Sequence, residues 1–134
     1  MEVAQDAAGA YAKREEAYMW MTVGERRFAI TLSNTDAALA LAAQLPLMLD
    51  MAELNGNEKH ADLPKELPID ASRPGTIRNG DLMLYGSVTL VIFYETFRSS
   101  YSYTRIGWVE DPDELSRALG RSDARVTFTK DQVR

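Results

Sequence analysis

The sequence has no cysteine and a single histidine in 134 residues. Without cysteine, disulfides, iron–sulfur clusters, zinc-thiolate sites and thiol nucleophiles are excluded. A transition-metal site would need carboxylates beside the one histidine, and the DxDxDG spacing of a calcium loop is missing, so we expect no metal site. No apolar run reaches about 18 residues, the length of a membrane-spanning helix.

Several signature motifs are missing as well. The sequence contains no GxSxG, GxxxxGK[ST] or GxGxxG, so hydrolase and nucleotide-binding interpretations have no motif support, and we expect no cofactor. The net charge of −5, from 15 basic and 20 acidic residues, argues against nucleic acid or an anionic membrane as a partner. Residues 1–17 lack the basic and apolar regions of a secretory signal, which predicts a cytoplasmic protein.

What is present fits one compact domain. The chain is 46% hydrophobic and long enough to bury a sizeable core. We place this domain at residues 18–130, after an N-terminal extension (1–17) that is either helical or mobile and before a polar tail (131–134).

Alternating apolar residues predict strands through most of the domain. The alternation over 18–32, with Gly24-Glu25 in the middle, predicts a β-hairpin with a two-residue turn. A second hairpin is predicted over 81–95 around Gly86-Ser87, and its second arm is apolar enough to be covered on both faces. Further strands are predicted over 47–54, 99–109 and 125–130.

Two helices and one long loop complete the prediction. Ser33 or Asn34 is expected to cap a helix over 35–45 that is apolar nearly all round, and such a helix is covered on most sides. Asp111, Pro112 and Glu114 predict the start of a second helix, which Gly120 ends. Residues 55–80 carry Asn-Gly pairs and prolines and are predicted to be a long loop with at most short strands. The order of elements favours a closed or nearly closed barrel with a helix over each end.

These segments also carry a family resemblance. Taken together, MWMTVGERRFAITL, LNGNEKHADLP, GTIRNGDLMLYGSVTLVIFYETF and YSYTRIGWVEDPDELSRAL resemble the bacterial cyclophilin-like domain family, over roughly residues 20–128. The resemblance implies a mainly β protein, a small closed cyclophilin-like β-barrel of about eight strands with two capping α-helices. It implies no established biochemical activity.

Peptidyl-prolyl isomerisation is the activity that such a barrel would suggest. A cyclophilin seats proline on an apolar floor and aims an arginine at the imide nitrogen, which weakens its double-bond character. In authentic cyclophilins an Arg, a Phe and a Gln for this task follow the first helix, but residues 47–70 of this sequence contain none of the three. No catalytic residue is therefore carried over, and Arg78 or Arg105 would have to act from another strand.

Candidate binding residues come from two parts of the chain. Strand alternation would place Tyr101, Tyr103 and Arg105 on one face, which suits a carboxylate, a peptide or a planar ligand, although tyrosines also fill barrels. His60 lies near Glu58 and Asp62 and is either an acid–base group or a surface histidine. If the acidic 50–70 region folds over the tyrosines, Glu58 or Asp62 would pair with Arg78 or Arg105.

The sequence thus predicts a noncatalytic binding module for a small molecule or a peptide, either monomeric or homodimeric. A divergent prolyl isomerase is the enzyme alternative, and an assembly role through an edge strand or the N-terminal segment is a third. The residues predicted to line the pocket are Asn55, Glu58, His60, Asp62, Arg78, Tyr85, Tyr101, Tyr103 and Arg105.

Overall fold

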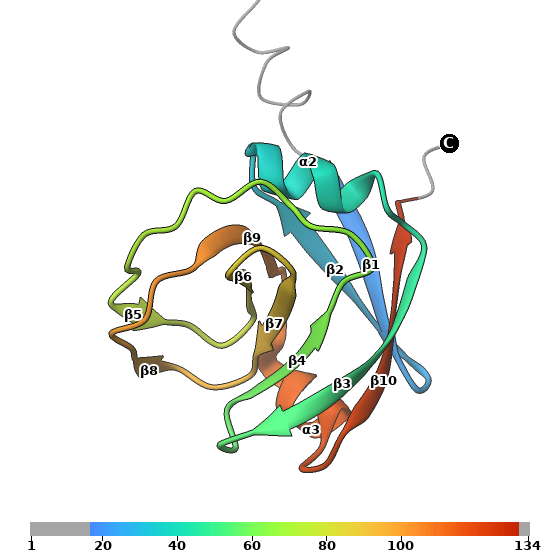
Figure 1. Cartoon of the computed structure of the whole chain (residues 1–134). Coiled ribbons are helices and arrows are strands. Elements are labelled where there is room, and N and C mark those ends of the chain that lie inside the picture. Colours follow the sequence, from blue (N-terminus) through green and yellow to red (C-terminus); the bar gives the residue numbers. More distant parts are fainter. Residues whose placement is uncertain (1–16, 132–134) are drawn as a thin grey trace, which may run out of the picture.

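Eight antiparallel strands close into a barrel in the computed structural model, which describes residues 17–131 (Figure 1). Around the barrel the strand order is β1-β10-β3-β4-β7-β6-β9-β2. The small closed barrel expected from the sequence is confirmed. What the sequence suggested for residues 1–16 and 132–134 lies outside the described residues.

The strands are β1 (Ala17–Val23), β2 (Arg26–Leu32), β3 (Leu47–Leu54), β4 (Glu58–Asp62), β5 (Thr76–Ile77), β6 (Asp81–Tyr85), β7 (Thr89–Phe93), β8 (Phe97–Arg98), β9 (Thr104–Val109) and β10 (Ala124–Lys130). The helices are α2 (Asp36–Ala42), the 3-10 turn η1 (Pro112–Glu114) and α3 (Leu115–Leu119). Figure 1 shows α2 over one end of the barrel and α3 at the opposite end. Within residues 17–131, no helix is long and apolar enough to cross a membrane.

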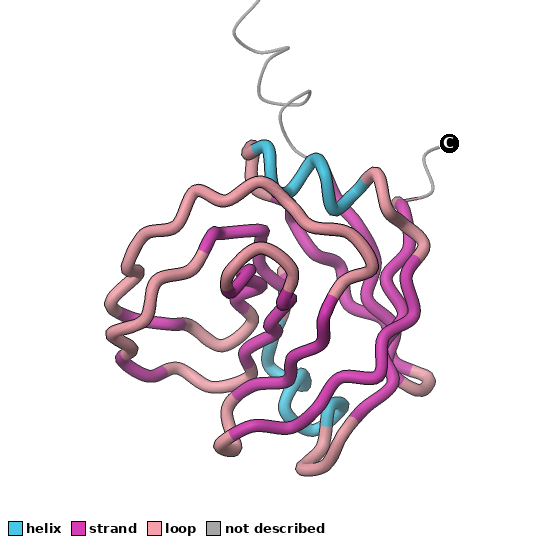
Figure 2. Tube along the Cα trace, in the orientation of Figure 1, coloured by secondary structure: helices cyan, strands magenta, loops and turns pink. Residues whose placement is uncertain are grey.

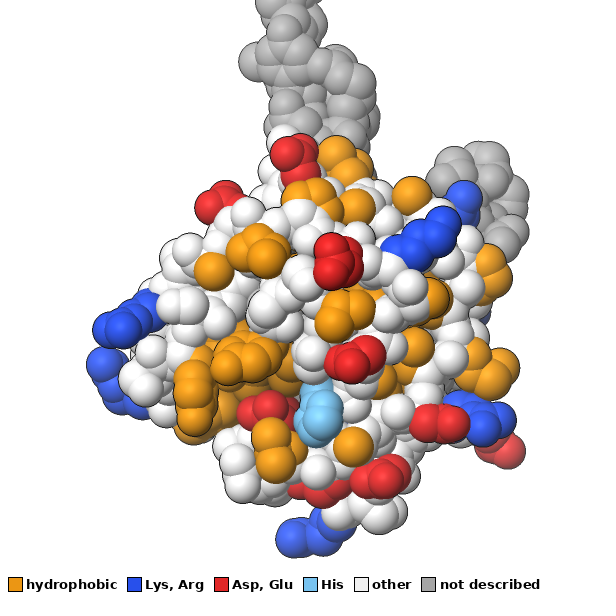
Figure 3. All heavy atoms as spheres, viewed as in Figure 1, with side chains coloured by type: hydrophobic (Ala, Val, Ile, Leu, Met, Phe, Trp, Pro, Cys, Tyr) orange, Lys and Arg blue, Asp and Glu red, His pale blue; other side chains and the backbone are white. Residues whose placement is uncertain are grey.

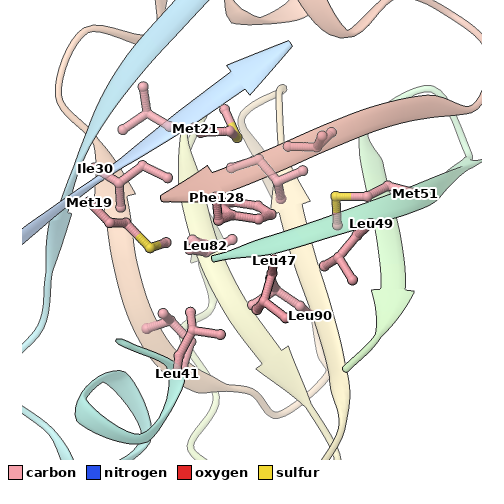
Figure 4. Close-up of a cluster of buried hydrophobic side chains, with 14 of the residues drawn as sticks. Met19, Met21, Ile30, Leu41, Leu47, Leu49, Met51, Leu82, Leu90 and Phe128 are labelled. Atoms are coloured by element: carbon pink, nitrogen blue, oxygen red, sulfur yellow. The ribbon is translucent and has the colours of Figure 1, made fainter. Parts of the chain in front are cut away.

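The barrel interior is filled by apolar side chains that alternate along the strands, as the sequence predicted (Figure 4). In the first hairpin Met19 lies across from Ile30 and Met21 across from Phe28, and all four side chains are buried. The second hairpin pairs β6 with β7, and β7 is covered on both faces as expected.

The first helix differs from its prediction in two ways. Its N-cap is Thr35, whose Oγ1 accepts a hydrogen bond from the Ala38 N–H at 3.1 Å, so neither Ser33 nor Asn34 caps it. It is also covered on one face only, because Leu39 is 59% exposed while Leu41 is buried. A helix lying across the barrel mouth has neighbours on its inner side alone.

The second helical segment begins at the predicted residues, with Asp111 as N-cap and Pro112 first, but its capping and helix type differ from the prediction. Asp111 makes no side-chain capping bond, and the chain first forms the 3-10 turn η1. Glu114, the expected partner in a capping box, instead lies 3.2 Å from Arg26 and 3.4 Å from Arg117. These ion pairs draw its carboxylate away from the backbone. The predicted end is confirmed, since α3 stops at Leu119, directly before Gly120.

The loop predicted over 55–80 contains a barrel strand. Asn55 and Gly56 both have positive φ, at 58° and 69°, and the Asn57 N–H donates to the Leu54 carbonyl at 3.2 Å. This tight turn joins β3 to β4, and β4 also pairs with β7. The remainder of the segment does run outside the barrel wall towards β5 (Figure 2).

The strand predicted over 99–109 is shorter than expected. The short strand β8 leaves the barrel to pair with β5, so β9 begins only at Thr104. A register shift between β6 and β9 then breaks the alternation. Ile106 is buried and Trp108 is 41% exposed, although regular alternation would place them on one face. The shared face predicted for Tyr101, Tyr103 and Arg105 is therefore not a strand face.

Candidate functional site

On the outer face of the barrel, a row of polar residues on β4 lies beside a mostly apolar row on β7. Leu90 and Ile92 of β7 point into the barrel core, so the residues between and after them face outwards. Residues directly across an antiparallel pair share a face. The outward pairs are Glu58 with Phe93, His60 with Val91 and Asp62 with Thr89.

Aromatic rings build a wall over this face. The Tyr85 ring lies 6.2 Å from Tyr101, nearly perpendicular to it, and 5.9 Å from Tyr103. The Phe93 ring lies 5.5 Å from Tyr103 and 5.7 Å from Phe97. Such tilted and edge-to-face contacts are the favoured arrangements of aromatic pairs. They hold the segment after β7 against the outside of the barrel.

A pocket of about 590 Å³ opens between the wall and β4. Figure 3 views this face, where hydrophobic side chains gather beside the histidine with acidic side chains around them. The lining residues are Leu54, Asn55, Asn57, Glu58, His60, Asp62, Tyr85, Thr89, Val91, Phe97, Arg98, Ser99, Ser100, Tyr101 and Tyr103.

The pocket brings together most of the residues proposed from the sequence. Those on its lining are Asn55, Glu58, His60, Asp62, Tyr85, Tyr101 and Tyr103. Arg78 and Arg105 are not on the lining, and both contact Asp81 at the start of β6, Arg105 through its guanidinium and Arg78 through its backbone. The Arg105 guanidinium lies 3.5 Å from the Asp81 carboxylate, and the Arg78 backbone N–H donates to the same carboxylate at 2.9 Å.

The ion pairs expected between Glu58 or Asp62 and Arg78 or Arg105 do not form. Asp62 instead accepts a hydrogen bond from the Thr89 hydroxyl at 2.8 Å. Among the described residues, no group donates a hydrogen bond to the carboxylate of Glu58 and none forms an ion pair with it. Burial raises the pKa of Glu58, and the nearby His60 only partly opposes this shift. Burial likewise raises the pKa of Tyr103.

Sequence reasoning missed several lining residues. Leu54 and Asn57 flank the Asn-Gly turn, so recognising that turn as a hairpin would have found them. Phe97 and Arg98 form β8, a strand too short to show alternation. Arg98 matters most, because it is an arginine on the pocket lining, where Arg78 and Arg105 are absent.

A second polar cluster lies inside the barrel, beneath α3. The Lys59 ammonium donates to Glu53 Oε1 at 2.7 Å and to the Gly120 carbonyl at 2.9 Å. The Tyr94 hydroxyl donates to the same Glu53 oxygen at 2.6 Å. Burial works to raise the pKa of Glu53, but the hydrogen bonds from Lys59, Tyr94 and Gly56 outweigh it and lower that pKa. Burial and the Glu53 carboxylate raise the pKa of Tyr94. Lys59 is completely buried, so this cluster joins strands to α3 and is not part of the pocket.

Residues 17–131 contain no group of three or more His, Asp or Glu side chains that would hold a metal ion. A model of the cyclophilin-like family matches residues 21–129, which is most of the chain. Searches of curated proteins and of solved structures gave no significant match.

Proposed function

Because the chain belongs to the cyclophilin-like family and has an aromatic-walled pocket outside its barrel, we propose that it is a binding module for a small ligand or a peptide segment. Ligand pockets are concave and mostly apolar, of about 300–1,000 Å³, with a few polar groups that fix orientation. The pocket over β4 and β7 has this size and this composition. It is the single observation that carries the proposal.

The wall suits reversible binding of a flat or extended ligand. Tyr85 and Tyr101 are 49% and 62% exposed, so each offers ring surface and a hydroxyl to a ligand. Tyrosine supplies a large contact area with few rotatable bonds, so that little conformational entropy is lost on binding. The floor below is formed by Val91, which packs in a small apolar cluster with Ile77, Met83, Phe93 and Tyr103.

A prolyl isomerase is the second candidate, and Arg98 is the observation that favours it. Catalysis of imide rotation needs a donor aimed at the proline nitrogen from a fixed position. Arg98 lies on the lining, but it is exposed and belongs to the two-residue strand β8. A guanidinium without an ion-pair partner among the described residues is less well fixed than that task requires, so we place binding first.

One NMR experiment separates the two candidates. A panel of X-Pro peptides is added to the ¹⁵N-labelled protein, amide shifts report binding, and exchange cross-peaks between the cis and trans peptide signals report catalysis. We expect saturable shifts without accelerated exchange. Accelerated exchange that Arg98→Ala abolishes would instead establish the isomerase.

The matched variants are Tyr101→Ala and Trp108→Ala. Both residues are exposed aromatics, but only Tyr101 lines the pocket. Binding should weaken in Tyr101→Ala and persist in Trp108→Ala. Equal effects of the two substitutions would contradict the assignment of the pocket.

A further inference from the structure

Two acceptors on the pocket lining have no donor. Glu58 is half-buried beside Phe93, and no described residue donates to its carboxylate. Asn57 has a buried side-chain oxygen without a hydrogen-bond partner in the described part of the chain. Burying an acceptor without a donor is unfavourable. A ligand that brings an N–H donor into the pocket would remove this cost at Glu58.

Elsewhere in this protein, another partly buried carboxylate does have its hydrogen-bond donors. Inside the barrel, Glu53 is paired with the ammonium of Lys59, and that ammonium also lies 5.0 Å from the centre of the Tyr94 ring. Carboxylate and tyrosine ring together hold the cation. The pocket outside offers the same two partners, a carboxylate and tyrosine rings, but no ammonium.

The charges on the lining favour a cation. The lining carries the carboxylates of Glu58 and Asp62, against the exposed residue Arg98 and the histidine His60 beside Glu58. The surrounding stretch 50–70 has six acidic residues and only two lysines. One of these lysines, Lys59, points into the barrel and does not reach the surface.

We propose, on the basis of the binding function above, that the pocket selects a cationic head, an ammonium or guanidinium group carried on an aliphatic stem. The head lies between the Glu58 carboxylate and the rings of Tyr85 and Tyr101, and the stem lies over Val91. A free amine and the side chain of a peptide lysine or arginine share this chemistry.

The test compares probes that share an aliphatic stem and differ in whether it ends in a cation. The peptides Ac-Gly-Lys-Gly-NH₂ and Ac-Gly-norleucine-Gly-NH₂, and separately butylammonium and butanol, are titrated into the labelled protein at low salt. We expect the charged member of each pair to bind about tenfold more tightly. Tighter binding of the lysine peptide than of butylammonium identifies a peptide as the source of the cation, and the reverse order identifies a small amine.

Two matched variants tie the effect to Glu58. Glu58→Gln keeps the shape of the side chain and removes its charge, whereas Asp50→Asn removes an exposed charge outside the pocket. The charge preference should disappear in Glu58→Gln and remain in Asp50→Asn. Its survival in Glu58→Gln would overturn the inference.

The outcomes also separate this inference from the binding function. If norleucine or proline peptides bind the pocket as tightly as the lysine peptide, the cation preference is wrong and the binding function stands. If no probe shifts the amides of the lining residues, both are overturned.

Discussion

A completely buried lysine holds one end of the barrel together. Lys59 lies across from Glu53 in the β3–β4 pair, so both side chains point inward, and the ammonium also reaches the carbonyl that ends α3. The cluster thus joins a hairpin to a helix from a distant part of the chain. The sequence did not indicate this cluster, because lysine is rarely buried and the polar composition of the EKHAD segment is typical of a loop.

Removing this ammonium should be costly. Lys59→Met keeps most of the buried volume but leaves the Glu53 carboxylate without its cation, and we expect the free energy of unfolding to fall by about 3 kcal/mol. Lys65→Met, on the exposed loop after β4, is the control and should change it by less than about 0.5 kcal/mol. Urea denaturation measures both. Similar losses in the two variants would show that the buried pair contributes nothing of its own.

The same cluster makes stability depend on pH. Since the pKa of Glu53 is lower in the folded protein than in the unfolded chain, its contribution is complete above about pH 4.5 and is lost as the pH falls through the lower folded-state value. We expect the urea midpoint of the wild type to drop more steeply below this pH than that of Glu53→Gln. Parallel curves for the two proteins would contradict the lowered pKa.

At the scale of elements, the alternation of apolar and polar residues predicted strands that have one buried and one exposed face. It failed where a tight turn or a β-bulge set the limits of a strand. The hairpin over 18–32 was found because its inward residues are consistently apolar, and the hairpin over 81–95 because its second arm is apolar on both faces. β4 was missed because its outward residues, Glu58, His60 and Asp62, are polar and one of its two inward residues is a lysine. The limits of β9 were missed because a register shift has no signal in hydropathy.

Close contact between β2 and β9 depends on one glycine. A Cβ atom at Gly107 would overlap the Thr31 carbonyl oxygen, so Gly107→Ala must push two paired strands apart. We expect a loss of about 3 kcal/mol in the free energy of unfolding. Gly56→Ala has open space around it but a positive φ, and should cost only about 1 kcal/mol. The comparison is made by urea denaturation, and an equal cost at both sites would refute the steric explanation.

At the scale of the whole molecule, the fold was predictable and the site only in part. Family resemblance and strand alternation led to the closed barrel, and two sequence segments rich in polar and aromatic residues led to seven of the fifteen residues that line the pocket. Which arginine joins them depends on how the chain folds around the barrel. Asp81 pairs with the Arg105 guanidinium, while β8 pairs with β5 outside the barrel and places Arg98 on the pocket lining. No local pattern in the sequence indicates which arginine lies on the pocket lining.

The most direct test of the binding assignment is an amide chemical-shift map. The labelled protein is titrated with the tightest binder of the proline and lysine peptide series, and the perturbed amides are assigned. The account predicts that they fall in residues 54–62, 85–91 and 97–103, around the pocket. Perturbations centred on α2, where Leu39 is exposed, or none with either series, would contradict it.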